Sequence, residues 1–162
     1  MQNKETKKTA LARKQTSPLI YIISSFLIVC ILILGFLVLR QQINHVQYRS
    51  VVIGGSSLKL ELASTQSERE KGLSEREAIP ADGMFFDFQV DGDWQMWMLQ
   101  MRFPIDIAWL KKDGEIIKIK ASAQPGDYPE VYHAEQLSHY VIEVPAGTFN
   151  RLGVHEGDTI KL

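Results

Sequence analysis

The chain has 162 residues, of which 45% are hydrophobic and 23% are charged, and its formal net charge is −1. This size fits one globular domain with an appendage and excludes a large multidomain enzyme. The small net charge is a cancellation, because residues 1–47 carry +5 whereas residues 48–162 carry twelve Lys/Arg against eighteen acids, a net −6. Phosphate binding needs a net basic face, so the acidic part argues against nucleic acid as a partner.

Residues 19–39 form an uncharged, mostly apolar run that ends at Arg40. A helix of that length spans about 31 Å, the thickness of a hydrocarbon core. A cleaved signal peptide would have a shorter apolar region and a small-residue cleavage site, and Cys30 lacks the small preceding residues of a lipoprotein box. A buried core helix is the other alternative, although a helix apolar on every face is unusual in so small a protein. We therefore expect an uncleaved anchor in the lipid bilayer.

The flanking charges predict the orientation of this anchor. Five Lys/Arg precede the apolar run, whereas only Arg40 and Arg49 occur in the comparable stretch after it. The basic side stays in the cytoplasm. The predicted organisation is therefore a cytoplasmic segment 1–18, a single span of an inner or cytoplasmic membrane at 19–39, a tether at 40–50, and a periplasmic or extracellular domain at 51–162. Cys30 is the only cysteine, so this domain has no disulfide and no thiol nucleophile.

Short apolar runs separated by turn residues predict strands in the domain at 51–53, 58–62, 84–88, 94–98, 105–110, 115–120, 140–144 and 158–162. Thr65 and Glu68 form a capping box before a short helix at 66–75, and a helical turn at 148–152 ends at Gly153. Residues 122–138 are predicted as a polar loop. Close hairpins favour antiparallel pairing. We expect a mostly β (α+β) fold, a single antiparallel sheet curled into a barrel or roll.

Six short sequence motifs follow one another after residue 50 in a recognisable order. They are Glu68-Arg-Glu-Lys-Gly72-Leu73-x-x-Arg76, Gly83-Met84-x-Phe86-x-Phe88, Trp97-Met98 followed by Pro104-Ile-Asp106-Ile, the strand pair around Asp113-Gly114, Val141-Ile-Glu143-Val-Pro-Ala-Gly147, and Gly153-Val-x-x-Gly157-Asp158. With these motifs the chain resembles the domain of unknown function 192 family, also called uncharacterised protein family 0127, over nearly all of residues 51–162. The resemblance implies a β-rich fold behind an export signal or membrane anchor. It implies no established activity.

The chain departs from that family pattern at two places. Ser74 stands where the family usually has Met, although Arg76 is kept. After Trp-Met the family usually has Lys-Asn-Thr, and this chain has Leu99-Gln100-Met101. Either this member binds something different at the turn, with Gln100 as a candidate ligand-binding side chain, or the turn is structural.

Asp106 lies between Ile105 and Ile107 on a strand rich in large apolar residues. A partly buried carboxylate needs a partner, or its pKa rises. We expect that partner to be Arg76, in a structural ion pair or in a ligand-anchoring cleft beside Trp97. A solvent-facing Asp106 is the alternative.

Glu143 lies in the middle of the strand at 140–144 and could supply a second carboxylate with Asp106. Two carboxylates at a suitable separation hydrolyse glycosides. Strand alternation also permits a solvent-facing Glu143, which we favour. Trp97 is the candidate for stacking on a sugar ring or an apolar ligand, and core packing is the alternative for the aromatic residues Trp94, Trp97, Trp109, Tyr128 and Tyr132.

The remaining polar residues do not form a recognisable catalytic or metal-binding motif. His133 and His139 have three acids nearby but neither a helical i, i+4 spacing nor a His-x-His spacing, so we predict no metal and no cofactor. The serines at 56 and 57 lack a nucleophile elbow.

Three functions are consistent with these features. The first is a membrane-anchored extracytoplasmic binding or accessory module for a small ligand, an envelope glycan or an envelope protein, with Arg76, Trp97 and Asp106 near its site. The second is an envelope carbohydrate hydrolase that uses Asp106 and Glu143, whose carboxyl groups would have to share one pocket. The third is a structural protein-interaction domain with an exposed apolar patch.

Overall fold

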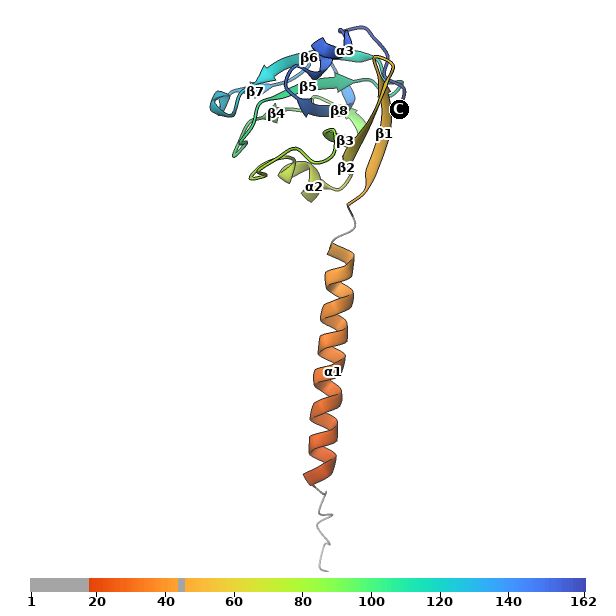
Figure 1. The fold of residues 1–162 in the computed structure, drawn as a ribbon, viewed down its shortest axis with the longest axis vertical. Helices are drawn as coiled ribbons and strands as arrows, with labels where there is room; N and C mark the ends of the chain where they lie inside the picture. Colours follow the sequence, from red (N-terminus) through yellow and green to blue (C-terminus); the bar gives the residue numbers. More distant parts are fainter. Residues whose placement is uncertain (1–17, 44–45) are drawn as a thin grey trace, which may run out of the picture. The chain divides into compact units, whose positions relative to one another are not determined.

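The computed structural model describes residues 18–43 and 46–162, and the chain divides into two compact units at His45 and Val46. The first unit contains helix α1 (Pro18–Ile43, Figure 1). The predicted cytoplasmic segment up to residue 17 and residues 44–45 of the predicted tether lie outside the described residues.

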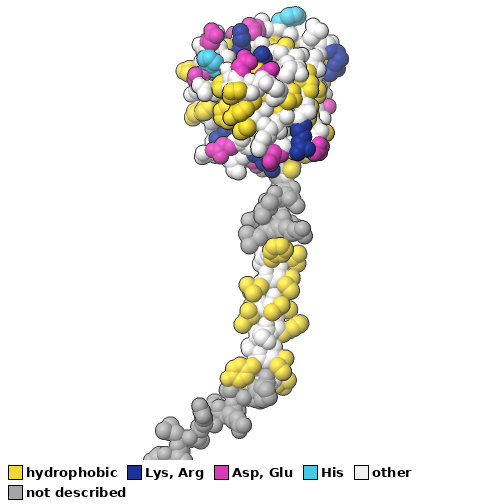
Figure 2. Space-filling model, turned by 90° about the vertical axis from the view of Figure 1, so that its left-hand side faces the viewer, with side chains coloured by type: hydrophobic (Ala, Val, Ile, Leu, Met, Phe, Trp, Pro, Cys, Tyr) yellow, Lys and Arg dark blue, Asp and Glu magenta, His cyan; other side chains and the backbone are white. Residues whose placement is uncertain are grey.

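The large apolar side chains of helix α1 between Leu19 and Val38 are exposed. Its segment Leu19–Val38 is long and apolar enough to cross a membrane, and none of it is buried (Figure 2). The hydroxyls of Ser24 and Ser25 donate to the carbonyls of Tyr21 and Ile22, one turn back. Both serines therefore satisfy their hydroxyls within the helix, as a membrane anchor or a signal sequence requires.

The second unit is built on a six-stranded sheet. Its strands, in spatial order, are β1 (Tyr48–Ile53), β2 (Ser56–Ala63), β3 (Met84–Gly92), β8 (Ser138–Pro145), β5 (Ile105–Leu110) and β6 (Ile116–Ala123). A separate two-stranded sheet pairs β4 (Met96–Trp97) with β7 (Val131–Tyr132). Three short helices complete the domain, α2 (Gln66–Lys71), the 3₁₀ helix η1 (Pro125–Asp127) and α3 (Thr148–Leu152).

The main sheet is mixed, which corrects the prediction of purely antiparallel pairing. β2 and β3 run parallel, because residues 64–83 with α2 form a crossover instead of a hairpin. The mostly β fold and its roll are confirmed, but the sheet does not close into a barrel. The C-terminal residues 158–162 join the two edges of the roll through bridges from Lys161 to Val52 in β1 and from Thr159 to Glu115 before β6.

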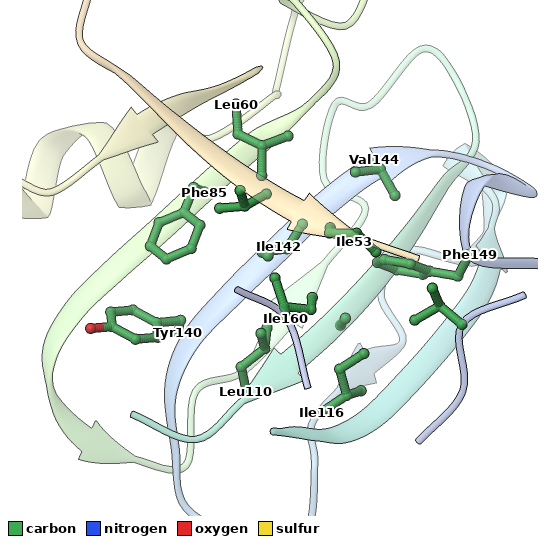
Figure 3. Packing of buried hydrophobic residues seen from close by; sticks show 13 residues of the cluster. Ile53, Leu60, Phe85, Leu110, Ile116, Tyr140, Ile142, Val144, Phe149 and Ile160 are labelled. Carbon is green, nitrogen blue, oxygen red and sulfur yellow. The ribbon is translucent and has the colours of Figure 1, made fainter. Parts of the chain in front are cut away.

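Two apolar cores lie on opposite faces of the sheet. The first fills the roll, and Figure 3 shows its side chains converging from β1, β3, β8, β5 and α3. The second lies on the outer face, where α2 and the segments around β4 and β7 cover it; its buried members include Trp109, Phe86, Met84 and Met98. β8 lies between β3 and β5, and its residues from Ser138 to Val144 are all buried.

Several predicted boundaries change for local reasons. α2 ends at Lys71 instead of residue 75, because Gly72 has a φ of +49° and its N–H donates to the carbonyl of Glu68. The strand predicted at 94–98 is shorter in the structure, where β4 pairs with β7 inside the predicted polar loop. The predicted strand 158–162 forms only the two edge bridges.

Gly83 gives a direct test of how β3 enters the sheet. A Cβ at this position would lie well within the van der Waals contact distance of the Glu143 carbonyl oxygen, and the φ of Gly83, +148°, is one that other residues rarely adopt. We expect Gly83→Ala to lower the free energy of unfolding by about 2–4 kcal/mol. Urea denaturation checks this, with Gly126→Ala as the control, because nothing lies within 4 Å of a Cβ at Gly126. Equal stability of the two variants would contradict the described packing.

Candidate functional site

Glu143 is a carboxyl group that β8 directs into the second core. Its neighbours across the sheet are Met84 in β3 and Ile107 in β5. Residues paired across neighbouring strands point to the same face. Both neighbours belong to the second core, so Glu143 occupies a position where a hydrophobic side chain would be expected.

The Glu143 carboxyl is buried and lacks a partner. The residue is 4% exposed, and within residues 18–43 and 46–162 its side chain forms no hydrogen bond or ion pair. Burial raises the pKa of Glu143 to about 8, because desolvation disfavours the charged carboxylate. The prediction that this side chain faces solvent is therefore wrong, and at neutral pH the carboxyl is mostly protonated.

A recess of about 350 Å³, which we call the aromatic hollow, connects Glu143 with the surface. Its lining is mostly apolar and comes from α2 and the residues after it, from β3, from the segment around β4 and from β8. The lining residues are Gln66, Arg69, Glu70, Lys71, Gly72, Leu73, Ser74, Phe86, Phe88, Trp94, Gln95, Met96, Trp97, Met101 and Glu143. Its volume is that of a small-ligand site.

Helix α2 forms one wall of the aromatic hollow, and its capping box fixes where this wall begins. The Glu68 amide donates to the Thr65 hydroxyl, and the Thr65 amide donates to the Glu68 carboxylate, so the predicted capping box is confirmed. The Thr65 amide lowers the pKa of Glu68. Arg69 donates to the carbonyls of Ser64 and Asp87, which anchors α2 to the residue that follows β2 and to the middle of β3.

The segment around β4 forms the opposite wall. Trp94 stacks on Phe88 with ring centroids 4.0 Å apart, and its carbonyl accepts a hydrogen bond from Nε1 of the fully buried Trp109. Trp97 pairs with Val131 of β7 and remains 45% exposed. Trp109 is thus a core residue, whereas Trp94 and Trp97 line the hollow.

Two hydrogen bonds connect the walls where the chain departs from the family pattern. The Ser74 hydroxyl donates to the Leu99 carbonyl, and the Glu75 amide donates to the Gln100 carbonyl. Ser74 and Met101, both at departing positions, line the hollow, whereas Gln100 does not.

Of the predicted site residues, the structure brings Trp97 and Glu143 together in the aromatic hollow. Arg76 does not pair with Asp106 as predicted. It binds both carboxylate oxygens of Glu61, with nitrogen–oxygen distances of 2.6 and 2.9 Å. This ion pair forms because Glu61 lies beside Met84 on the face that carries Glu143.

Asp106 lies on the opposite face of the sheet, opposite Val144 and next to the first core. It is 1% exposed, and its oxygens accept hydrogen bonds from the amides of Ser122 and Phe149. Asp106 therefore holds the backbone of β6 at Ser122 and the backbone at the start of α3. Because Asp106 and Glu143 point to opposite faces, the predicted pair of catalytic carboxylates is wrong.

The two histidines that were weighed as metal ligands, His133 and His139, bind different acids. His139 contacts Asp91 at 2.7 Å and His133 contacts Asp93 at 3.2 Å, so the two histidines hold the end of β3 and the residue that follows it. Across the described residues, no group of three or more His, Cys, Asp or Glu side chains is placed to hold a metal ion.

Sequence reasoning missed Phe88 and Arg69 as parts of the site. Both come from motifs that were recognised, but only the parallel crossover brings α2 against β3. The alternation of β3 indicated that Phe86 and Phe88 share a face, and this was the one local signal for the aromatic wall.

Fold and site together define a small, mostly β domain with an aromatic recess, preceded in the chain by an apolar helix. The model of the DUF192 family, described as uncharacterized ACR, COG1430, matches residues 49–162, and the chain belongs to this family. No curated protein matches the chain.

Two solved structures are similar to this chain. A protein of Sinorhizobium meliloti 1021, described as a "putative transcription regulator", is 32% identical with a TM-score of 0.65, and the match covers 73% of this chain and 97% of that one. A protein of unknown function from Novosphingobium aromaticivorans DSM 12444 is 28% identical with a TM-score of 0.66, and the match covers 74% of this chain and 88% of that one. The match covers nearly all of the first protein, and in this chain Val46–Leu162 is a compact unit of its own.

The buried Glu143 predicts a pH-dependent stability. Its pKa is about 8 when folded and near its ordinary 4.5 when unfolded, so between these values the folded state binds more protons. The free energy of unfolding therefore falls as pH rises through this window, by up to about 1.4 kcal/mol per pH unit from this group. We expect Glu143→Gln to remove this component, so urea denaturation of residues 46–162 should show the variant gaining on wild type from pH 5 to 8. A constant difference would contradict a buried, unpaired carboxyl.

Proposed function

We propose that this protein is a membrane-anchored binding module, and that its β domain holds a small ligand in the aromatic hollow. The observation that carries the proposal is the Glu143 carboxyl, which is buried without a partner at the end of an apolar recess. A buried polar group without a hydrogen bond costs folding free energy. A ligand that offers a hydrogen bond to Glu143 would recover part of that cost.

The other lining residues suit a ligand with an apolar face. Trp97, Trp94 and Phe88 present large aromatic surfaces that bind apolar groups at little conformational cost. The contacts of Ser74 and Glu75 with the turn at 99–100 hold both walls in place before binding. Preorganisation of this kind lowers the entropic cost of association.

The domain's charge and the helix support the location of the module. α1 has the length and composition of a membrane span, and more Lys/Arg precede it than follow it. We therefore place the N-terminus in the cytoplasm, and the domain in the periplasm or outside the cell. The net charge of −6 on residues 48–162 weighs against nucleic acid as the ligand.

The binding function is tested with matched variants on the two strands of the small sheet. Trp97 lines the hollow, whereas Val131, its partner in the pairing and equally exposed at 45%, does not. In a fragment screen of residues 46–162 by thermal shift and NMR, we expect ligands whose affinity falls about tenfold in Trp97→Ala. Val131→Ala should leave their affinity unchanged. A screen without any Trp97-dependent ligand would contradict the proposal.

The anchor is tested by fractionation of cells that express the full chain. We expect the chain to stay with the membrane after a carbonate wash, with an intact mass that includes residues 1–45. Protease added to spheroplasts should degrade the domain. Removal of residues 1–45 should release the domain to the soluble fraction. A full chain found in the cytosol, or a mass that lacks residues 1–45, would contradict an uncleaved anchor.

A further inference from the structure

In the described part of the chain Glu143 lacks a hydrogen-bond donor, and this indicates which polar group a ligand in the aromatic hollow would carry. Its carboxyl group has no donor among the described residues, and neighbouring Met84 and Ile107 offer none. A molecule bound in the hollow can supply this polar contact. A hydroxyl, an amide and an ammonium group are the common candidates.

The aromatic wall favours a cation among these candidates. Phe88 and Trp94 are stacked, and the guanidinium carbon of Arg69 lies 5.3 Å from the centre of the Phe88 ring. This wall therefore already carries one cation on an aromatic face. Trp97, the most exposed ring of the hollow, has no such partner among the described residues and offers the strongest cation–π surface of any side chain.

The charges around the hollow are compatible with a second cation. The charged lining residues are Arg69, Glu70, Lys71 and Glu143, whose formal charges cancel when Glu143 is ionised. Arg69 is already engaged by two backbone carbonyls. Elsewhere on this face, Glu61 is neutralised by Arg76. The domain as a whole carries −6, which attracts cations from solution.

We infer that the aromatic hollow binds a small organic amine in its protonated form, with the ammonium group bonded to Glu143 and the apolar stem between the aromatic side chains. This inference rests on the proposed binding function. Binding needs the Glu143 carboxylate, so a carboxyl that is protonated before binding releases one proton to solvent as the ammonium group enters. The ammonium keeps its own proton, and no covalent bond changes.

The test compares two probes that differ only in the polar group, cyclohexylmethylamine and cyclohexylmethanol, titrated into residues 46–162 and followed by NMR. We expect the amine to bind at least tenfold more tightly than the alcohol at pH 8. Because the carboxyl has to ionise, the affinity for the amine should rise about tenfold from pH 6 to pH 7, whereas the affinity for the alcohol should not change. Glu143→Gln should lower the affinity for the amine at least tenfold and leave the affinity for the alcohol unchanged.

The outcomes separate the two proposals. If both probes bind equally and both depend on Trp97, the amine inference is wrong and the binding module stands. If the amine binds with no dependence on pH or on Glu143, the inference is also wrong. If neither probe binds and the fragment screen finds no Trp97-dependent ligand, both proposals are wrong. The pH dependence in wild type keeps the inference falsifiable should Glu143→Gln not fold.

Discussion

Strand β8 has to bury both of its faces, and the position of the candidate site follows from this constraint. β3 and β5 flank it, and an apolar core lies on each side of the sheet. Alternate residues therefore enter different cores: Ile142 and Val144 point into the roll, and Val141 and Glu143 point to the outer face. A polar residue at such a position has no route to solvent except through a gap in the covering layer. The aromatic hollow is that gap.

The covering layer on the outer face is assembled from short segments that come from distant parts of the chain. Arg69 anchors α2 to the residue after β2 and to the middle of β3, and the turn at 99–100 is hydrogen-bonded to Ser74 and Glu75. None of these segments is a long regular element. The layer is therefore held by a few specific hydrogen bonds, which leave a recess of about 350 Å³ instead of a continuous core.

Local patterns in the sequence predicted most strands, the capping box at Thr65 and the helical turn at 148–152, because these depend on residues near one another. The pairing of β4 with β7 and the parallel crossover between β2 and β3 could not be predicted, since they depend on contacts between distant segments. The positions of the site residues could not be predicted for the same reason, because they also depend on contacts between distant segments. Asp106 and Glu143 are both flanked by apolar residues, and only the register between β5 and β8 shows that they face opposite cores. Arg76 pairs with Glu61 for the same reason, because the crossover places them side by side.

Glu143 lowers the stability of the fold where it lies, and we propose that it serves ligand recognition. An aliphatic side chain there would complete the second core, whereas the carboxyl, which has no partner among the described residues, adds a polar group beside the aromatic side chains of the hollow. The direct measurement of this claim is a carbon-13 NMR titration of the glutamate carboxyl groups in residues 46–162, with Glu143→Gln to assign the resonance. We expect the resonance that is missing from the variant to titrate near pH 8 in the wild-type domain. A midpoint near 4.5 for that resonance would contradict it.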